Sequence, residues 1–240
     1  MVAAQKTKWN IHQREVVLDV GGESLEGTLA IPEGARGLVL FAHGSGSSRH
    51  SPRNRFVAQF LQSQRIATLL FDLLTRHEGS VDERTAEHRF DIPFLSKRLI
   101  GATEWVLKFP VTSDLSFGYF GASTGAAAAL VAAAELPAAI SSVVSRGGRP
   151  DLAAASLRAV HAPTLLIVGG HDYPVIDMNR EALAALECPE KQLLIIPGAT
   201  HLFEEPGTLE EVARVAAEWF VRHFKAAEEV EPQLAAARVS

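Results

Sequence analysis

The stretch Leu115-Ser-Phe-Gly-Tyr-Phe-Gly-Ala-Ser-Thr-Gly-Ala-Ala-Ala-Ala-Leu130 decides the fold of this chain. Its first half is an apolar run typical of a strand buried on both faces, and its second half is a run of small residues that predicts a tightly packed helix. The segment Gly121-Ala-Ser-Thr-Gly125 joins the two halves and fits the pattern G-x-S-x-G. Glycines suit a sharp strand-to-helix turn, because neighbouring backbone crowds such a turn. We therefore expect the hydroxyl of Ser123 to stand above the end of a sheet.

Short apolar runs recur along the chain on both sides of this stretch, and amphipathic segments separate them. The runs that we expect to form strands are 37–43, 66–71, 115–120, 140–144, 164–168 and 192–196. Helical spacing of apolar residues marks the segments around 56–61, 95–109 and 209–220. Strands that alternate with helices predict an α/β fold with right-handed crossovers and a mostly parallel, doubly wound sheet.

The first segments of the chain follow a different pattern. Residues 14–20 and 24–31 alternate in polarity on either side of Gly21-Gly22, which predicts an antiparallel N-terminal hairpin. No repeat or internal linker interrupts the sequence, so we expect a single domain over residues 1–240, with 226–240 as a loose or helical C-terminal tail. Few residues separate Thr124 from the next strand, which leaves no room for a large cap domain.

Composition excludes several classes of protein. The 240 residues are 47% hydrophobic and carry a net charge of −5, whereas a nucleic-acid partner normally requires a basic face. The N-terminal residues lack the apolar stretch of a secretory signal, and no run reaches the roughly 18 apolar residues of a membrane span. The single cysteine, Cys188, excludes an internal disulfide and multi-cysteine zinc sites. We expect a cytoplasmic protein that binds neither nucleic acid nor membrane.

An acid and a histidine follow two later strands. Asp172 ends the segment Gly169-Gly-His-Asp172 after the strand at 164–168, and His201 ends Gly198-Ala-Thr-His201 after the strand at 192–196. Sites in open α/β sheets form beyond the carboxyl ends of the strands. Taken singly, His201 could be a surface residue and Asp172 a helix cap, but Asp177 is the better cap for a helix around 178–186. The order Ser123, Asp172, His201 therefore predicts a catalytic triad, since this chain order is that of α/β-hydrolases.

A glycine-rich loop, His43-Gly-Ser-Gly46, follows the strand at 37–43. An oxyanion hole needs one backbone N–H after the nucleophile and a second from this loop, so we expect the amides of Thr124 and Ser45 to supply them. A phosphate-binding loop is a poor alternative, because the sequence from Gly44 lacks the last glycine of G-x-G-x-x-G and contains no G-K-[ST]. The alternative for Ser123 is a glycine-rich turn without catalytic function. The elbow, Asp172, His201 and the glycine-rich loop would then occur together only by chance. The predicted chemistry requires no metal and no organic cofactor.

With these residues placed, the chain resembles the α/β-hydrolase superfamily over roughly Val16 to Phe224, and within it the dienelactone-hydrolase-like branch. The segments 43–55, 145–151 and 197–203 resemble a group sometimes joined to a phosphoribosyltransferase domain, which we do not expect within these 240 residues. The resemblance implies hydrolysis of a carboxylic ester or lactone. Dienelactone hydrolases typically use cysteine as the nucleophile, so the serine of this elbow favours a general esterase.

The expected substrate is a small, fairly soluble ester. The span Leu73–Arg89 is charged and is expected to form a flap, which argues against a deep apolar lipase tunnel. Arg49 and Arg146 follow strand ends at the same sheet edge, and one of them is expected to bind an anionic ester or lactone, because a guanidinium pairs well with carboxylates. The alternative is that these arginines brace loops. Alternative functions that would share these residues are those of a thioesterase, an acyltransferase or a non-catalytic ligand-binding protein. The sequence does not determine whether the protein forms homo-oligomers.

Overall fold

The computed structural model describes residues 9–225, so the predicted tail at 226–240 lies outside the described residues. Its strands are β1 (Ile11–Val20), β2 (Glu23–Pro32), β3 (Gly37–Ala42), β4 (Ala67–Phe71), β5 (Ser116–Ala122), β6 (Ile140–Arg146), β7 (Thr164–Gly169) and β8 (Lys191–Ile196). Its helices are α1 (Pro52–Ser63), α2 (Arg76–Thr85), α3 (Ile92–Lys108), α4 (Thr124–Glu135), the 3-10 helix η1 (Pro150–Ala159), α5 (Tyr173–Ala185) and α6 (Thr208–His223).

One eight-stranded sheet runs through the molecule in the order β1-β2-β4-β3-β5-β6-β7-β8. Strands β3 to β8 are parallel to one another, while β1 pairs antiparallel with β2, and β2 antiparallel with β4. The predicted hairpin and the mostly parallel sheet are therefore confirmed. The chain leaves β3 toward β4 on one side, whereas β5 lies on its other side. Ligands of open α/β sheets bind at such a reversal of strand order, beyond the carboxyl ends of the strands.

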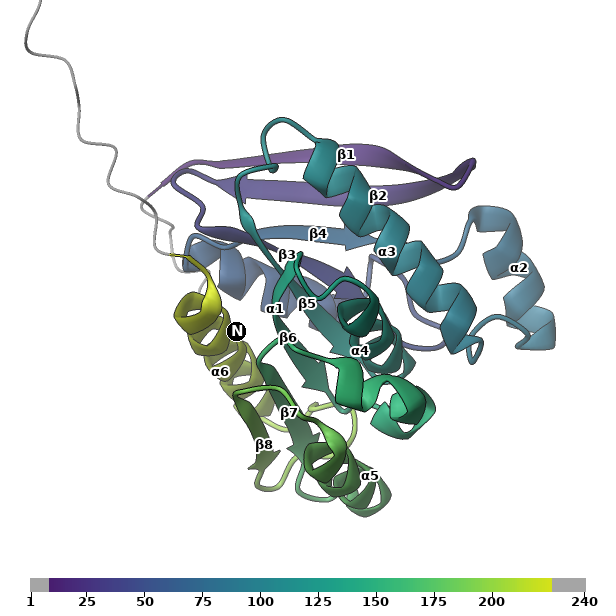
Figure 1. Ribbon diagram of the computed structural model, residues 1–240, viewed down its shortest axis with the longest axis vertical. Coiled ribbons are helices and arrows are strands. Elements are labelled where there is room, and N and C mark those ends of the chain that lie inside the picture. The colour runs from purple at the N-terminus through teal and green to yellow at the C-terminus, as the bar shows by residue number, and fades with distance from the viewer. Residues whose placement is uncertain (1–8, 226–240) are drawn as a thin grey trace, which may run out of the picture.

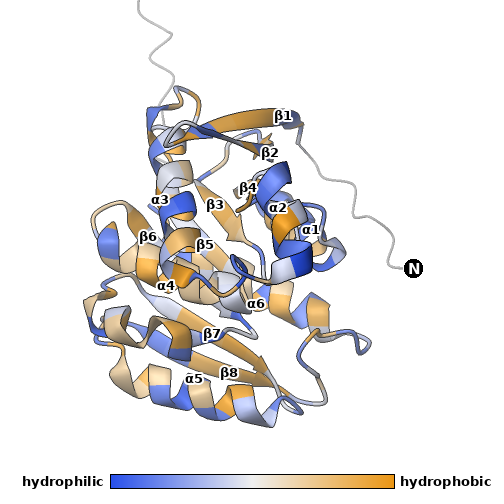
Figure 2. Ribbon diagram, turned by 90° about the vertical axis from the view of Figure 1, so that its right-hand side faces the viewer, coloured by the Kyte–Doolittle hydropathy of each residue, from blue (hydrophilic) through white to orange (hydrophobic). Residues whose placement is uncertain are grey.

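Helices cover the sheet in two layers. In Figure 1, α3, α4 and α5 lie over one face, while α1 and α6 lie over the other. Each face has its own buried cluster, one built with residues of α3 and α4 and the other with residues of α1 and α6. Figure 2 shows β3, β7 and β8 largely in hydrophobic colours and the helices in mixed ones. Burial on both faces explains why the parallel strands are continuous apolar runs rather than alternating ones.

Two elements differ from the expectations. The predicted flap at 73–89 contains the helix α2. In Figure 1 this helix stands apart from the two layers, beside the N-terminal end of α3. Helix α5 begins at Tyr173, five residues before the predicted segment at 178–186. No helix among residues 9–225 is both long enough and apolar enough to cross a bilayer.

Candidate active site

Ser123 occupies a strained turn between β5 and α4. Its backbone adopts φ 52° and ψ −120°, a conformation that L-residues avoid, since it costs of order 1–3 kcal/mol. The surrounding structure imposes this geometry: the Ser123 N–H donates to the Arg146 carbonyl at 3.2 Å, and its carbonyl accepts from Arg149 N–H at 3.2 Å. Strain at a functional side chain is typical of nucleophile elbows. The turn that the sequence predicts is therefore present.

Two glycines make the elbow sterically feasible. A Cβ atom on Gly121 would collide with the backbone of Ala126 in α4, and one on Gly125 would collide with the carbonyls of Ala42 and His43. The missing side chains let α4 start directly against the ends of β3 and β5. Gly44 approaches from the other side, where an added Cβ would lie 3.1 Å from the Ser123 Cβ. The glycine-rich loop after β3 thus passes immediately beside Ser123.

Asp172 and His201 form a short hydrogen bond across two neighbouring loops. His201 Nδ1 lies 2.6 Å from Asp172 Oδ2, and the two side chains are 39% and 13% exposed, respectively. An ionised carboxylate only accepts hydrogen bonds, so Nδ1 is the donor of this pair, and in the neutral ring Nε2 then has the lone pair. That tautomer is the one a general base requires.

Close packing of the loops after β7 and β8 positions this pair. A Cβ on Gly169 would lie 2.5 Å from the carbonyls of Ala199 and Thr200, so only glycine lets the two loops approach. The His171 N–H donates to the Ala199 carbonyl at 2.9 Å and ties the loops together. Gly169, in the segment that leads to Asp172, therefore helps to form the pair, because it allows the loop that carries His201 to reach the acid.

The end of β6 connects Ser123 to His201. The carbonyl of Arg146 accepts the Ser123 N–H, and the next residue, Gly147, is in contact with the His201 ring: a Cβ there would lie 3.4 Å from Nδ1 and Cε1. Within residues 9–225 the structure has a hydrogen bond from His201 to Asp172 but none from Ser123 to His201. Catalytic hydrogen bonds are often long without substrate and shorten in the complex. The three predicted residues thus gather at the carboxyl edge of the sheet.

The two residues predicted to supply the oxyanion donors are in contact through their side chains. Ser45 Oγ and Thr124 Oγ1 are 3.1 Å apart, which brings the loop after β3 against the first turn of α4. Thr124 is the first residue of this 12-residue helix, so its N–H has no acceptor within the helix. The positive end of the helix dipole also points at this place. An anion that forms beside Ser123 would meet both effects.

His43, which sequence reasoning treated only as the start of the loop, fixes the loop's position. Its Nδ1 lies 3.0 Å from the carbonyl of Gly44, and its Nε2 accepts the N–H of Leu73 at 3.1 Å. The ring is therefore neutral, with its proton on Nδ1. Burial lowers the pKa of His43, although the Gly44 carbonyl and the charge of Asp72 oppose the shift. The sequence feature that could have indicated this role is a histidine that directly follows a buried strand and precedes a glycine.

A cavity of about 480 Å³ opens beside the loop after β3, within the range of roughly 300–1,000 Å³ for small-molecule sites. Ser45, Thr124 and residues of α2 line it, and Leu73 and Leu95 supply apolar surface. Many of the other lining residues carry hydroxyl or charged groups. The space next to the predicted oxyanion donors is thus partly enclosed and presents both polar and apolar surface.

Arg49 does not face this cavity as a free cation. Its guanidinium donates to Asp72 at 3.1 Å, to Glu26 at 2.8 Å and to Glu15 at 3.1 Å, and its side chain is only 11% exposed. Burial alone would lower the pKa of Arg49, but the three carboxylates outweigh burial and raise it. The contacts match the alternative in which Arg49 braces loops rather than binds a substrate.

Arg146 has different surroundings. It is 7% exposed, its Nη2 lies 3.5 Å from Asn54 Oδ1, and its guanidinium lies 5.8 Å from the centre of the Phe203 ring. No carboxylate of residues 9–225 lies within ion-pair distance, and its buried Nε has no partner there. Burial, together with the nearby charge of Arg53, lowers the pKa of Arg146 to about 10. Its backbone adjoins Ser123, so its side chain starts close to the predicted nucleophile.

The expected division of labour between Asp172 and Asp177 is partly wrong. Asp172 occupies the N-cap position of α5, but its side chain makes no capping hydrogen bond and turns to His201 instead. Asp177 lies inside the helix and pairs with Arg180 at 3.0 Å, so it caps nothing. Pro174 at the start of α5 explains the earlier beginning of the helix, because proline is favoured in the first turn.

Comparison with known proteins finds solved structures that are similar to most of the chain. A dienelactone hydrolase from Anabaena variabilis ATCC 29413 is 58% identical to the chain, with a TM-score of 0.88 over 90% of this chain and 99% of that one. Est1E from Butyrivibrio proteoclasticus is 16% identical, with a TM-score of 0.73 over 87% of this chain and 98% of that one, and shows similarity of fold alone. No protein-family model matches the chain.

Two curated relatives are longer than this chain. They come from Mycobacterium tuberculosis strains CDC 1551 and H37Rv, are provisionally named phosphoribosyl transferases, and are 56% identical over 215 residues. The match covers 89% of this chain and 47% of each relative, so the chain spans about half of their length.

Proposed function

The chain belongs to the dienelactone-hydrolase-like branch of the α/β-hydrolases, and on that premise we propose that it hydrolyses small carboxylic esters or lactones. Ser123 is the nucleophile, His201 the general base and acid, and Asp172 the residue that orients the histidine. The observation that carries the proposal is the strained elbow at Ser123, which lies at the same sheet edge as the 2.6 Å pair between His201 and Asp172.

Acylation begins when Ser123 Oγ attacks the ester carbonyl carbon and transfers its proton to His201 Nε2. The carbonyl oxygen becomes an oxyanion, which accepts hydrogen bonds from the amides of Thr124 and Ser45. Asp172 stabilises the imidazolium through the Nδ1 hydrogen bond. The tetrahedral intermediate then expels the alkoxide, which takes the proton from Nε2 and leaves as an alcohol. Ser123 now carries the acyl group.

Deacylation repeats the same steps with water. His201 Nε2 accepts a proton from the attacking water, the second oxyanion forms at the same two amides, and collapse of the intermediate returns the proton to Ser123 Oγ. The carboxylic acid departs and the enzyme is restored. None of these steps requires a metal or an organic cofactor.

Arg146, rather than Arg49, is the basis for a proposal about the charge of the substrate. Arg49 is bound to three carboxylates, while Arg146 has no such partner within residues 9–225, and its backbone carbonyl accepts the Ser123 N–H. We propose that Arg146 favours esters or lactones that carry a carboxylate, because a buried guanidinium gains most from an anionic partner.

The direct experiment measures hydrolysis of p-nitrophenyl acetate and butyrate by wild type and by Ser123→Ala. Hydrolysis that disappears in the variant supports the proposal. A wild type that cleaves no ester refutes it and favours a non-catalytic ligand-binding protein. Parallel assays with an acyl-thioester and with an added alcohol acceptor distinguish thioester hydrolysis and acyl transfer, which would use the same residues.

A further inference from the structure

One face of α2 forms part of the wall of the cavity that the predicted oxyanion donors also line. Thr75, Arg76, Gly79, Asp82 and Glu83 line the cavity, at the three- and four-residue spacing of neighbours on one helix face. Ser45 and Thr124 line the same cavity. A substrate whose carbonyl oxygen is held by these two residues therefore has the cavity, and with it α2, beside it.

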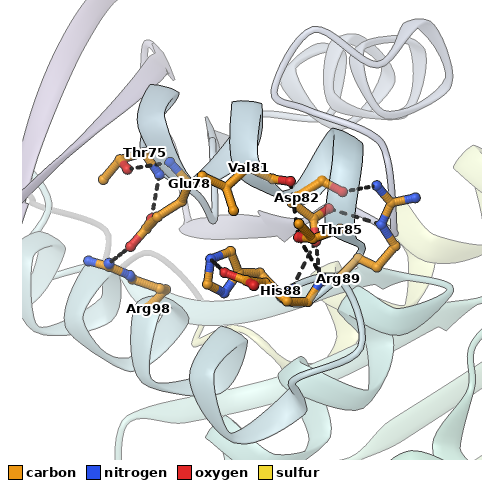
Figure 3. Close-up of polar contacts among 9 residues, drawn as sticks. Thr75, Glu78, Val81, Asp82, Thr85, His88, Arg89 and Arg98 are labelled. Atoms are coloured by element: carbon orange, nitrogen blue, oxygen red, sulfur yellow. Dashed lines mark hydrogen bonds and ion pairs between the residues drawn. The ribbon is translucent and has the colours of Figure 1, made fainter.

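Polar contacts at both ends hold α2 in place (Figure 3). At its start, Thr75 and Glu78 form a reciprocal capping box, and Glu78 also binds Arg98 of α3 at 2.6 Å. At its end, Asp82 accepts the N–H groups of His88 and Arg89 and the Arg89 Nε, each at 2.9 Å. The helix is thus a defined wall.

The carboxylate of Asp82 shows how firmly the end of α2 is held. It is 3% exposed, and burial alone would raise its pKa. The hydrogen bonds from His88 and Arg89 outweigh burial and lower the pKa of Asp82 instead. The carboxylate therefore stays ionised and bonded at neutral pH, and the wall keeps its position.

Gly79 is the one position of this wall without a side chain. A Cβ atom added there would meet no heavy atom within 4 Å, and its φ lies outside the left-handed region that favours glycine. Neither crowding nor backbone geometry therefore requires glycine here. Glycine inside a helix is also less stable than alanine. What glycine provides at this position is space that a side chain of any other residue would occupy.

We propose that Gly79 determines the size of the substrate, by leaving room in the cavity for the group attached to the ester carbonyl on its acyl or alkoxy side. The inference rests on the proposed function, because it assigns the cavity to the substrate of Ser123. A side chain at position 79 would project into the cavity and shorten it, while the residues at the sheet edge would stay unchanged. Large esters would lose their place and small ones would not.

The test compares wild type with Gly79→Leu and Gly79→Ala. One ester series lengthens the acyl group (p-nitrophenyl acetate, butyrate and octanoate), and the other lengthens the alkoxy group (ethyl, butyl and octyl acetate). In Gly79→Leu, kcat/KM for the longest ester of at least one series should fall about 10-fold or more relative to its shortest member. Gly79→Ala should have a smaller effect in the same direction and a higher Tm, which keeps the test valid if the leucine variant fails to fold.

Ser80→Leu is the matched control, because Ser80 is the next residue of α2, is exposed and does not line the cavity. It should leave the size profile of both series unchanged. Equal losses for all sizes in Gly79→Leu, no change in either series, or the same profile in Ser80→Leu would overturn the inference. A wild type that hydrolyses acetate but shows one of these outcomes refutes the role of Gly79 alone, whereas a wild type that hydrolyses no ester refutes the proposed function.

Discussion

The pair formed by Asp172 and His201 allows a quantitative prediction for Asp172→Asn. An imidazolium and a carboxylate 2.6 Å apart attract each other by about 6 kcal/mol at an effective dielectric constant of about 20. Each 1.36 kcal/mol corresponds to a factor of ten in rate, so this attraction corresponds to somewhat more than 10⁴. The His201 side chain is 39% exposed, and water screens part of the attraction. We expect kcat to fall by about 10⁴.

The assay is steady-state hydrolysis of p-nitrophenyl acetate, with unfolding in urea as the measure of stability. Asp172→Asn should remain folded, since asparagine keeps the size of the side chain. Asp177→Asn is the control: it lies one turn along the same helix, is exposed and pairs only with Arg180. A surface pair of this kind contributes about 0–1 kcal/mol, so this variant should keep nearly full activity.

Two results would refute the reasoning about the acid. The first is an Asp172→Asn enzyme that is folded and keeps a tenth or more of the wild-type kcat, because the histidine would then not depend on this carboxylate. The second is an equal loss in Asp177→Asn, which would attribute the effect to α5 rather than to the pair.

Three further predictions follow from the same site. Ser123→Ala should lower kcat by about 10⁴ to 10⁶ and abolish labelling by a fluorophosphonate probe, and persistent labelling would place the nucleophile elsewhere. Burial lowers the pKa of His43, so on acidification the unfolded chain takes up a proton at this residue before the folded protein does. The free energy of unfolding, measured in urea, should therefore fall by about 1.4 kcal/mol per pH unit as the pH drops below about 6.5. If His43→Gln shows the same dependence on pH as wild type, this explanation is wrong. Arg146→Met should lower kcat/KM for a carboxylate-bearing ester about 10- to 100-fold more than for its neutral analogue, and equal losses would give Arg146 a structural role.

The parallel strands were predictable because each is an apolar run, and a strand buried between two helical layers has to be one. The positions of Ser123, Asp172 and His201 at strand ends followed from the same pattern, since the carboxyl ends of parallel strands share one edge. The φ of Ser123 was implied by its flanking glycines. What the sequence did not show is the contact between Gly169 and the loop after β8, which depends on two segments about 30 residues apart.

Helix α2 was not predicted from the sequence, and neither were two of the carboxylate partners of Arg49, although the alternative that Arg49 braces loops was considered. Residues 76–85 contain one apolar residue of the aliphatic type, Val81, so no hydrophobic periodicity marks a helix. The capping box at Thr75 and Glu78 was the signal that could have found it. Arg49 binds Glu15 and Glu26, which lie in the N-terminal hairpin. Pairing of a charge with a distant segment is decided by the assembled sheet, and local sequence does not encode it.

The separation of α2 from the two helical layers has a consequence for the history of the molecule. The strands that carry Ser123 and the two loops of its partners are part of the buried sheet, where most substitutions would destabilise the whole domain. Helix α2 is attached through a few polar contacts at its ends. Given the role that we propose for Gly79, substitutions on the inner face of α2 would change the choice of substrate while the sheet edge at Ser123 keeps its geometry. Changes of specificity during the history of the molecule would then be concentrated in this one helix.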